Sequence, residues 1–420
     1  MMIDDIRPSK KPTQKQEPVK IQYENFQTPE KVAAEDSILR SATPPTKLTT
    51  EDKVDKMDIS SKPRPNQSQD KWFSLHWPPG KKEWAIAIVV LLLIGGLGAF
   101  LLSGNHKAKT VTIIKHKVVI PPKPTTVPST LSGLPVNPSI NKLPVTGVMI
   151  ENSTFARPQS GLGQASVVFE AIAEGGITRF LALYQDTSPD NVGPIRSARP
   201  YYEQWVLGFD AGYAHVGGSP EALADLNAWG VRDLDQFYNG GSYHRVSTRA
   251  APHNVYTSIS SLNQLESNKG FGTSTFTGFA RKVAAPSAHP TTTSINLTLS
   301  GPDYNVHYDY NAPTNSYNRN EAGVPHVDAN TNTQISPKVV IALVMPYSLE
   351  ADGYHSDYTT IGSGPVYVFQ DGLVTTGQWS KSSSTTQFVF TNSTGQPLKL
   401  NPGQTWLTAL STSANVTYSH

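Results

Sequence analysis

The stretch SVVFEAIAEGGITRFLALYQ (166–185) decides the fold, because it has the pattern of two strands joined by a tight turn. Apolar residues dominate both halves, and Gly175-Gly176 between them tolerates the positive φ angles of a two-residue hairpin turn. The preceding stretch VTGVMIEN (145–152) also has the composition of a strand. These residues predict the start of a folded domain near residue 143.

The hairpin carries three charged residues whose placement follows from the turn. Counting back from the two glycines puts Ile172 opposite Arg179. Glu170 and Glu174 then become diagonal neighbours of Arg179 on the same face. A shift of one residue in the pairing would destroy this arrangement, so it is a specific geometric prediction.

The chain after the hairpin predicts helices alternating with a strand. SARPYYEQWVLGF (197–209) indicates a helix, DAGYAHVGG (210–218) a strand, and SPEALADLNAWG (219–230) a second helix with Ser219 as its N-cap. This alternation favours an α/β fold for residues 143–288.

Residues 289–420 show no helical periodicity and predict a mainly β domain. Short runs rich in β-branched and aromatic residues alternate with turn residues, as in VYVFQDGLVTTGQW (366–379). Asp371-Gly372 within this run is a typical hairpin signal.

Three segments precede the domains. Residues 1–83 are polar and rich in Lys, Glu and Pro, which indicates a disordered cytoplasmic tail. Residues 84–104 carry no charge and are long enough to span a bilayer of roughly 30 Å, so they predict one transmembrane helix. Residues 105–142 form a Lys/Pro-rich linker. Lysine counting leaves the orientation ambiguous, but the lysine-poor C-terminal composition favours a cytoplasmic N-terminus and extracytoplasmic C-terminal domains.

Composition excludes several classes of protein. The chain has no cysteine, which excludes disulfides, thiolate metal sites and a cysteine nucleophile. Residues 124–420 hold 15 basic and 20 acidic residues, so this part lacks the overall positive charge expected of a nucleic-acid-binding protein. Neither a cofactor nor a metal site is predicted, because no nucleotide fingerprint and no metal-ligand spacing occurs.

GPIRSARP (193–200) contains the strongest candidate for ligand binding. Pro200 suits the first turn of a helix, and helix N-termini attract anions. Arg196 and Arg199 add two guanidinium groups suited to phosphate or carboxylate. The alternative of equal weight is that these arginines form structural ion pairs with Glu170, Glu174 or Asp210.

Further candidates surround this stretch. The ligand-binding set is Arg179, Arg196, Arg199, His215, Glu221, Arg249, His253 and Asn254. The weaker catalytic candidates are Glu170, Glu174, His215 and His253, since paired carboxylates and histidines can act as general acids and bases.

Several ordered blocks resemble the YerB-like family of bacterial envelope lipoproteins, which has two adjacent domains of unknown function. The blocks include the hairpin, VGPIRSARPYY, AHVGGSPEA, RAAPHNVYTS, SYNRNEAGVPHVD and LNPGQTWLTAL, and they span about residues 143–412. The polar positions that match the family pattern are Arg157, Glu170, Glu174, Arg179, Arg196, Arg199, His215, Glu221, Arg249, His253, Asn254, Arg319, His326 and Asp328.

The resemblance implies an anchored extracytoplasmic protein and no established reaction. Family members typically carry a lipidated cysteine, and this chain has none, so the apolar stretch at 84–104 would serve as the anchor. The resulting hypothesis is a single-pass envelope protein that binds an anionic cell-wall or envelope polymer. The alternatives are a hydrolase acting on envelope glycan or peptide, and a scaffold for other envelope proteins.

Overall fold

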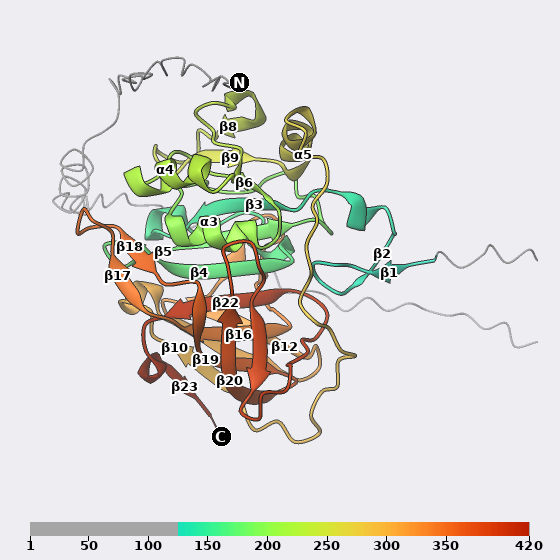
Figure 1. The fold of residues 1–420 in the computed structure, drawn as a ribbon. Coiled ribbons are helices and arrows are strands. Elements are labelled where there is room, and N and C mark those ends of the chain that lie inside the picture. The colour runs from blue at the N-terminus through green and yellow to red at the C-terminus, as the bar shows by residue number, and fades with distance from the viewer. Residues whose placement is uncertain (1–124, 420) are drawn as a thin grey trace, which may run out of the picture. The chain divides into compact units, whose positions relative to one another are not determined.

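Residues 125–419, which the computed structural model describes, are organised around a ten-stranded mixed sheet (Figure 1). In the order in which they lie, its strands are β21 (Val389–Asn392), β20 (Leu373–Lys381), β19 (Gly362–Gln370), β16 (Val339–Val344), β22 (Thr405–Leu410), β4 (Val167–Glu174), β5 (Ile177–Tyr184), β3 (Thr146–Glu151), β6 (Gly212–Ala214) and β7 (Arg232–Asp233). The predicted hairpin is present as β4 and β5, and Asp371-Gly372 joins β19 to β20.

Strand β22 joins the earlier and later parts of the chain. It pairs in parallel with β16 on one side and with β4 on the other. Thr405 therefore lies between Val339 and Val167. One sheet runs through both of the regions that the sequence distinguishes.

A five-stranded antiparallel sheet covers part of the large one. Its strands are β13 (Val324–Pro325), β12 (Ser316–Glu321), β11 (Val306–Asn311), β10 (Ser294–Leu297) and β23 (Val416–Tyr418). Four short pairs complete the strands: β1 (Val127–Pro128) with β2 (Pro135–Val136), β8 (Tyr243–Arg245) with β9 (Val255–Thr257), β14 (Val327–Asp328) with β15 (Thr333–Gln334), and β17 (Tyr347–Leu349) with β18 (Ser356–Tyr358). The C-terminal part is therefore mainly β, as predicted.

Three α-helices lie within the described residues: α3 (Pro200–Leu207), α4 (Pro220–Ala228) and α5 (Ile259–Asn268). The Ser219 hydroxyl accepts a hydrogen bond from the Ala222 N–H, which confirms the predicted N-cap of α4. The predicted helix 197–209 is too long, because Arg199 has an extended backbone (φ −142°) and α3 begins only at Pro200. The predicted strand 210–218 is likewise reduced to β6.

The central strands of the large sheet (β3, β4, β5, β16 and β22) are buried on both faces. Figure 1 shows α3 lying across β3, β4 and β5, where Trp205 stacks on Phe169 with ring centroids 5.0 Å apart. On the opposite face, the Phe180 and Trp406 rings pack edge to face, and the buried cluster to which they belong includes Leu262 of α5. Burial on both faces explains why the strands have nearly continuous apolar sequences.

The predicted tail (1–83), the predicted membrane span (84–104) and most of the predicted linker (105–142) lie outside the described residues. Among the helices of residues 125–419, none has both the length and the apolar character needed to cross a bilayer.

Candidate functional site

The β4–β5 hairpin contains an irregularity that separates the two glutamates. Ala171, and not Ile172, lies opposite Arg179, and the register shifts between Ile172 and Glu174. The predicted Ile172–Arg179 pair is therefore wrong, because a bulge inserts one extra residue before the turn. Glu170 lies directly opposite Phe180 and so faces the other side of the sheet from Arg179.

Glu174 joins two arginines in a buried ion-pair cluster. Its Oε1 accepts from Arg179, and its Oε2 lies 2.5 Å from Nη2 of Arg199. Both arginine side chains are 3% exposed, and each also donates to a main-chain carbonyl, of Ser197 and Ala198 respectively. Burial raises the pKa of Glu174, but the two guanidinium groups more than offset this and lower it to about 2.

This cluster decides between the two interpretations of Arg199. Its guanidinium is committed to Glu174 and to the chain at the start of α3. The ion-pair alternative is confirmed for Arg199, and Arg179 has the same role. Neither is positioned to receive an external anion.

Arg196 has a different environment. Its side chain is 25% exposed, and its Nε lies 3.4 Å from Oε1 of Glu151. Within residues 125–419 the guanidinium forms this one loose ion pair and no hydrogen bond. The partner is none of the three carboxylates considered from the sequence.

Glu151 links Arg196 to His253. The same Oε1 lies 2.8 Å from Nδ1 of His253 and accepts a 2.8 Å hydrogen bond from the Ser153 hydroxyl. Burial acts to raise the pKa of Glu151, but the hydrogen bond from His253 and the charge of Arg196 hold it below its usual value. Sequence reasoning missed Glu151. The available signal was a lone carboxylate ending an otherwise apolar strand.

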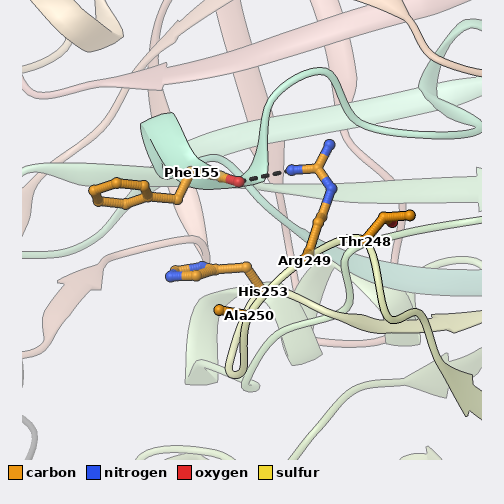
Figure 2. Close-up of a pocket in the computed structure, with 5 residues that line it drawn as sticks. All are labelled: Phe155, Thr248, Arg249, Ala250 and His253. Atoms are coloured by element: carbon orange, nitrogen blue, oxygen red, sulfur yellow. Dashed lines mark hydrogen bonds between the residues drawn. The ribbon is translucent and has the colours of Figure 1, made fainter. Parts of the chain in front are cut away.

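A hollow of about 460 Å³ opens beside His253, lined by Phe155, Thr248, Arg249, Ala250 and His253 (Figure 2). Arg249 donates to the carbonyls of Phe155 (2.6 Å) and Pro158 (2.7 Å), so it fixes the loop that presents Phe155. The Phe155 and His253 rings lie 5.6 Å apart. Arg196 does not line this hollow, but it shares Oε1 of Glu151 with His253. We call the linked group of Phe155, Arg196, Arg249 and His253 the Arg196 face.

The other sequence candidates do not line the hollow beside His253. His215 is fully buried, and its Nε2 lies 3.1 Å from Asp233 Oδ1. Asn254 accepts a 2.6 Å hydrogen bond from Arg245. Glu221 is exposed on α4, and burial together with the charge of Asp357 raises its pKa.

Glu170 belongs to a polar network around Arg319 that joins the two halves of the chain. Arg319 is fully buried and donates to Glu170 (3.1 Å), His326 (2.9 Å) and Tyr308 (2.9 Å). Its guanidinium also lies 4.5 Å from the ring centroid of Trp406. Because Glu170 is fully buried and its carboxylate is paired with Arg319, we interpret Glu170 as a structural residue.

The remaining family-like residues support this network. Arg157 lies 3.3 Å from Glu321, a second carboxylate beside Arg319, and Asp328 accepts from the Gly163 N–H at 2.7 Å. Burial and the charge of Arg319 lower the pKa of His326 well below its usual value, so the ring is neutral at pH 7. Its Nδ1 accepts from Arg319, which leaves Nε2–H to donate to a neighbouring glutamine.

Two further groups were not predicted from the sequence. Glu350, Asp352 and His355 each offer a potential metal-ligand atom within 4.8 Å of the others, although Asp352 already accepts two backbone N–H groups of its own turn. Glu203 on α3 is fully buried, and neither of its carboxylate oxygens has a hydrogen-bond partner within the described part of the chain. Burial raises the pKa of Glu203 to about 10.

Two family profiles match this chain. Residues 131–272 match the "Protein of unknown function (DUF3048) N-terminal domain" and residues 295–407 the corresponding C-terminal domain, so together they cover more than half of the chain. The chain is 28% identical over 298 residues to "Putative lipoprotein YerB" of Bacillus subtilis (strain 168), an alignment covering 70% of this chain and 89% of YerB. This protein belongs to the YerB-like family.

The fold agrees with this membership. The crystal structure of YerB protein from Bacillus subtilis matches this chain with a TM-score of 0.64 and 27% sequence identity. The match covers 70% of this chain and all of the YerB chain. The YerB-like architecture thus consists of two domains, the second mainly β, and the function of the family is not known.

Proposed function

We propose that this protein binds an anionic ligand of the cell envelope at the Arg196 face. The observation that carries the proposal is the contrast among three neighbouring arginines. Arg179 and Arg199 are buried and committed to Glu174, whereas the Arg196 side chain is partly exposed and its guanidinium forms no hydrogen bond within residues 125–419. An incoming carboxylate or phosphate could satisfy its guanidinium with two parallel hydrogen bonds.

The surroundings of Arg196 favour an anion. Arg249 and His253 line the neighbouring hollow, and the His253 imidazole is hydrogen-bonded to the same Glu151 oxygen that pairs with Arg196. This bond orients the imidazole ring. Because Glu151 is 3% exposed at its side chain, a ligand reaching this face meets the cations before the carboxylate.

The proposed setting is extracytoplasmic. The Bacillus subtilis relative is named as a lipoprotein, which supports an envelope location for this chain as well. The uncharged stretch 84–104 would act as a single-pass anchor, with residues 1–83 in the cytoplasm and the linker holding the domains outside. A scaffold role for the tail remains a prediction from the sequence.

The geometry does not favour the two glutamates of the hydrolase alternative as acid/base groups. Glu170 is fully buried beside Arg319, and Glu174 is held ionised by two arginines. A general acid must be protonated near its working pH and must reach the substrate. Neither carboxylate meets both conditions.

The test compares Arg196→Gln with Arg232→Gln. Arg232 has a similar exposed fraction (23%) and pairs with Asp210, so the two variants lose the same charge. Binding of citrate, inorganic phosphate and tetragalacturonate to the full-length chain is measured by calorimetry in a polyoxyethylene detergent, whose head group carries no sugar. We expect at least one anion to bind more weakly as salt rises. Its affinity should fall about tenfold or more in Arg196→Gln and stay unchanged in the control.

Equal binding by the parent chain and Arg196→Gln would overturn the proposal. So would a failure of all three anions to bind the parent chain.

A further inference from the structure

Two phenylalanines near Arg196 are exposed to solvent without a packing reason. Phe155 is 62% exposed and Phe237 is 66% exposed, while the aromatic residues of the core are almost fully buried. Tyr238, next to Phe237, is 79% exposed. Exposed aromatic groups that gather beside a polar site are typical of binding surfaces.

Each of the two phenylalanines is connected to Arg196 by a short series of contacts. His253 and Arg196 share Oε1 of Glu151, and the Phe155 ring lies 5.6 Å from the His253 ring. The Arg196 carbonyl accepts from the Val216 N–H at 3.1 Å. The adjoining Gly217 lies under Phe237: a Cβ added at Gly217 would be 3.0 Å from Cε2 of that ring.

We infer that the ligand of the Arg196 face is an acidic glycan whose sugar rings lie against Phe155 and Phe237 while an anionic group meets Arg196. This inference rests on the proposed function and names the class of its ligand. A pyranose ring presents an apolar face of C–H groups, which packs on an aromatic ring, and hydroxyl groups at its rim. Small anions would use Arg196 but leave both rings exposed.

The lining of the hollow next to Phe155 includes polar groups that can bond to sugar hydroxyls. Thr248 contributes a hydroxyl group and His253 an imidazole to its lining, and the volume of about 460 Å³ lies in the range of small-ligand sites. Figure 2 shows the Phe155 and His253 rings projecting to the same side, away from the Arg249 guanidinium. A sugar ring on Phe155 would therefore reach the imidazole.

An anionic membrane surface fits the same residues less well. Lipid recognition by charge uses clusters of about four to eight Lys or Arg residues. Here Arg245 and Arg249 donate hydrogen bonds to Asn254 and to main-chain carbonyls, which leaves Arg196 as the less engaged arginine of the group. One available cation with two exposed phenylalanines connected to it suits a polymer with spaced charges.

The experiment separates the ring contribution from the charge contribution. The full-length chain in polyoxyethylene detergent is titrated with tetragalacturonate (rings and carboxylates), citrate (carboxylates without rings) and maltotetraose (rings without charge). Phosphatidylglycerol vesicles provide the membrane arm. Phe155→Ala and Phe237→Ala are compared with Tyr347→Ala, an aromatic control that is 40% exposed on the β17–β18 hairpin.

We expect the affinity for tetragalacturonate to be about tenfold higher, or more, than the affinity for citrate or maltotetraose. Each phenylalanine variant should lose most of this extra affinity for tetragalacturonate. Its affinity for citrate and its thermal unfolding midpoint should stay unchanged, and Tyr347→Ala should behave as the parent chain. If citrate binds through Arg196 but tetragalacturonate binds no more tightly than citrate, the glycan inference is wrong and the proposed anion site is retained. If vesicles bind and the glycan does not, the ligand is a membrane surface and the inference is overturned. If no anion binds, the proposed function fails first.

Discussion

Arg319 and Arg196 both lie close to glutamates, but their side chains differ in burial and in hydrogen bonding. Arg319 is fully buried, and its donors reach Glu170, His326 and Tyr308 while its flat face lies on Trp406. Arg196 is one-quarter exposed and has a single carboxylate oxygen at 3.4 Å. The sequence resemblance singled out both residues, so the resemblance by itself does not separate the two roles.

The difference teaches where function is to be sought in such a fold. A buried guanidinium pays a large desolvation cost, which several well-placed hydrogen bonds offset. Once these bonds are formed, nothing remains for a ligand. The Arg196 guanidinium keeps its hydrogen-bond donors free because no group within residues 125–419 accepts from them, so these donors are available to a ligand.

The largest effect should come from breaking the Arg319 network. Glu170→Gln leaves the buried guanidinium without its closest charge partner, and we expect a loss of about 3–5 kcal/mol in the free energy of unfolding. Urea unfolding of the full-length chain followed by tryptophan fluorescence measures this loss, since Trp406 lies beside Arg319. The exposed Glu221→Gln is the matched control. A change below about 1 kcal/mol in Glu170→Gln would mean that the network is dispensable.

The second effect concerns Glu174 and depends on pH. The pKa of Glu174 in the folded state is lowered from 4.5 to about 2. Its contribution to the free energy of unfolding is therefore fully present above pH 4.5 and is lost as the pH falls toward 2. Glu174→Gln should cost about 3 kcal/mol at pH 7, and the cost should shrink as the pH falls below 4.5. Unfolding curves of both proteins at pH 7, 5 and 3.5 measure this trend. A constant difference across that range would contradict it.

The third effect has the opposite sign. Glu203 has a pKa raised from 4.5 to about 10, so ionisation opposes folding increasingly as the pH rises from 4.5 toward 10. Glu203→Gln should stabilise the fold by about 1–3 kcal/mol at pH 7, because the amide is neutral at every pH. The gain should disappear near pH 4. Thermal unfolding at pH 4, 7 and 8.5 tests this, and destabilisation at pH 7 would show that the carboxyl group has a partner.

The smallest effect on stability is expected at Arg196. Arg196→Gln should change the free energy of unfolding by less than about 1 kcal/mol, because its ion pair is long and partly exposed. Arg199→Gln, three residues away, should cost several times more, since it removes a buried partner of Glu174. Equal losses in the two variants would remove the distinction on which the proposed function depends.

Local sequence signals predicted a large part of the fold. The hairpin at Gly175-Gly176, the capped helix after Ser219 and the turn at Asp371-Gly372 each depend on residues adjacent in the chain, and all three are present. The bulge before Gly175 was not predictable, because the pattern of apolar residues does not reveal one extra residue in a strand.

The site was harder to predict because its contacts join distant parts of the chain. The sequence pointed to Arg196 and His253, but the carboxylate that links them is Glu151, about 100 residues before His253 in the chain. Glu170 was taken for a neighbour of Arg179, yet its partner is Arg319, 149 residues further on. Pairings of this kind depend on strand order, which no local pattern encodes.

The position of β22 between β4 and β16 has a consequence for biosynthesis. Until residues 405–410 leave the ribosome, β4 keeps an unpaired edge with the apolar sequence VVFEAIAE, which is a template for unwanted pairing. The first half therefore cannot complete its sheet while the chain is still being made, and a chain truncated before Thr405 would expose this edge permanently. The protein can therefore complete its fold only after the whole chain has been synthesised. Premature termination should yield aggregates in place of a folded N-terminal fragment.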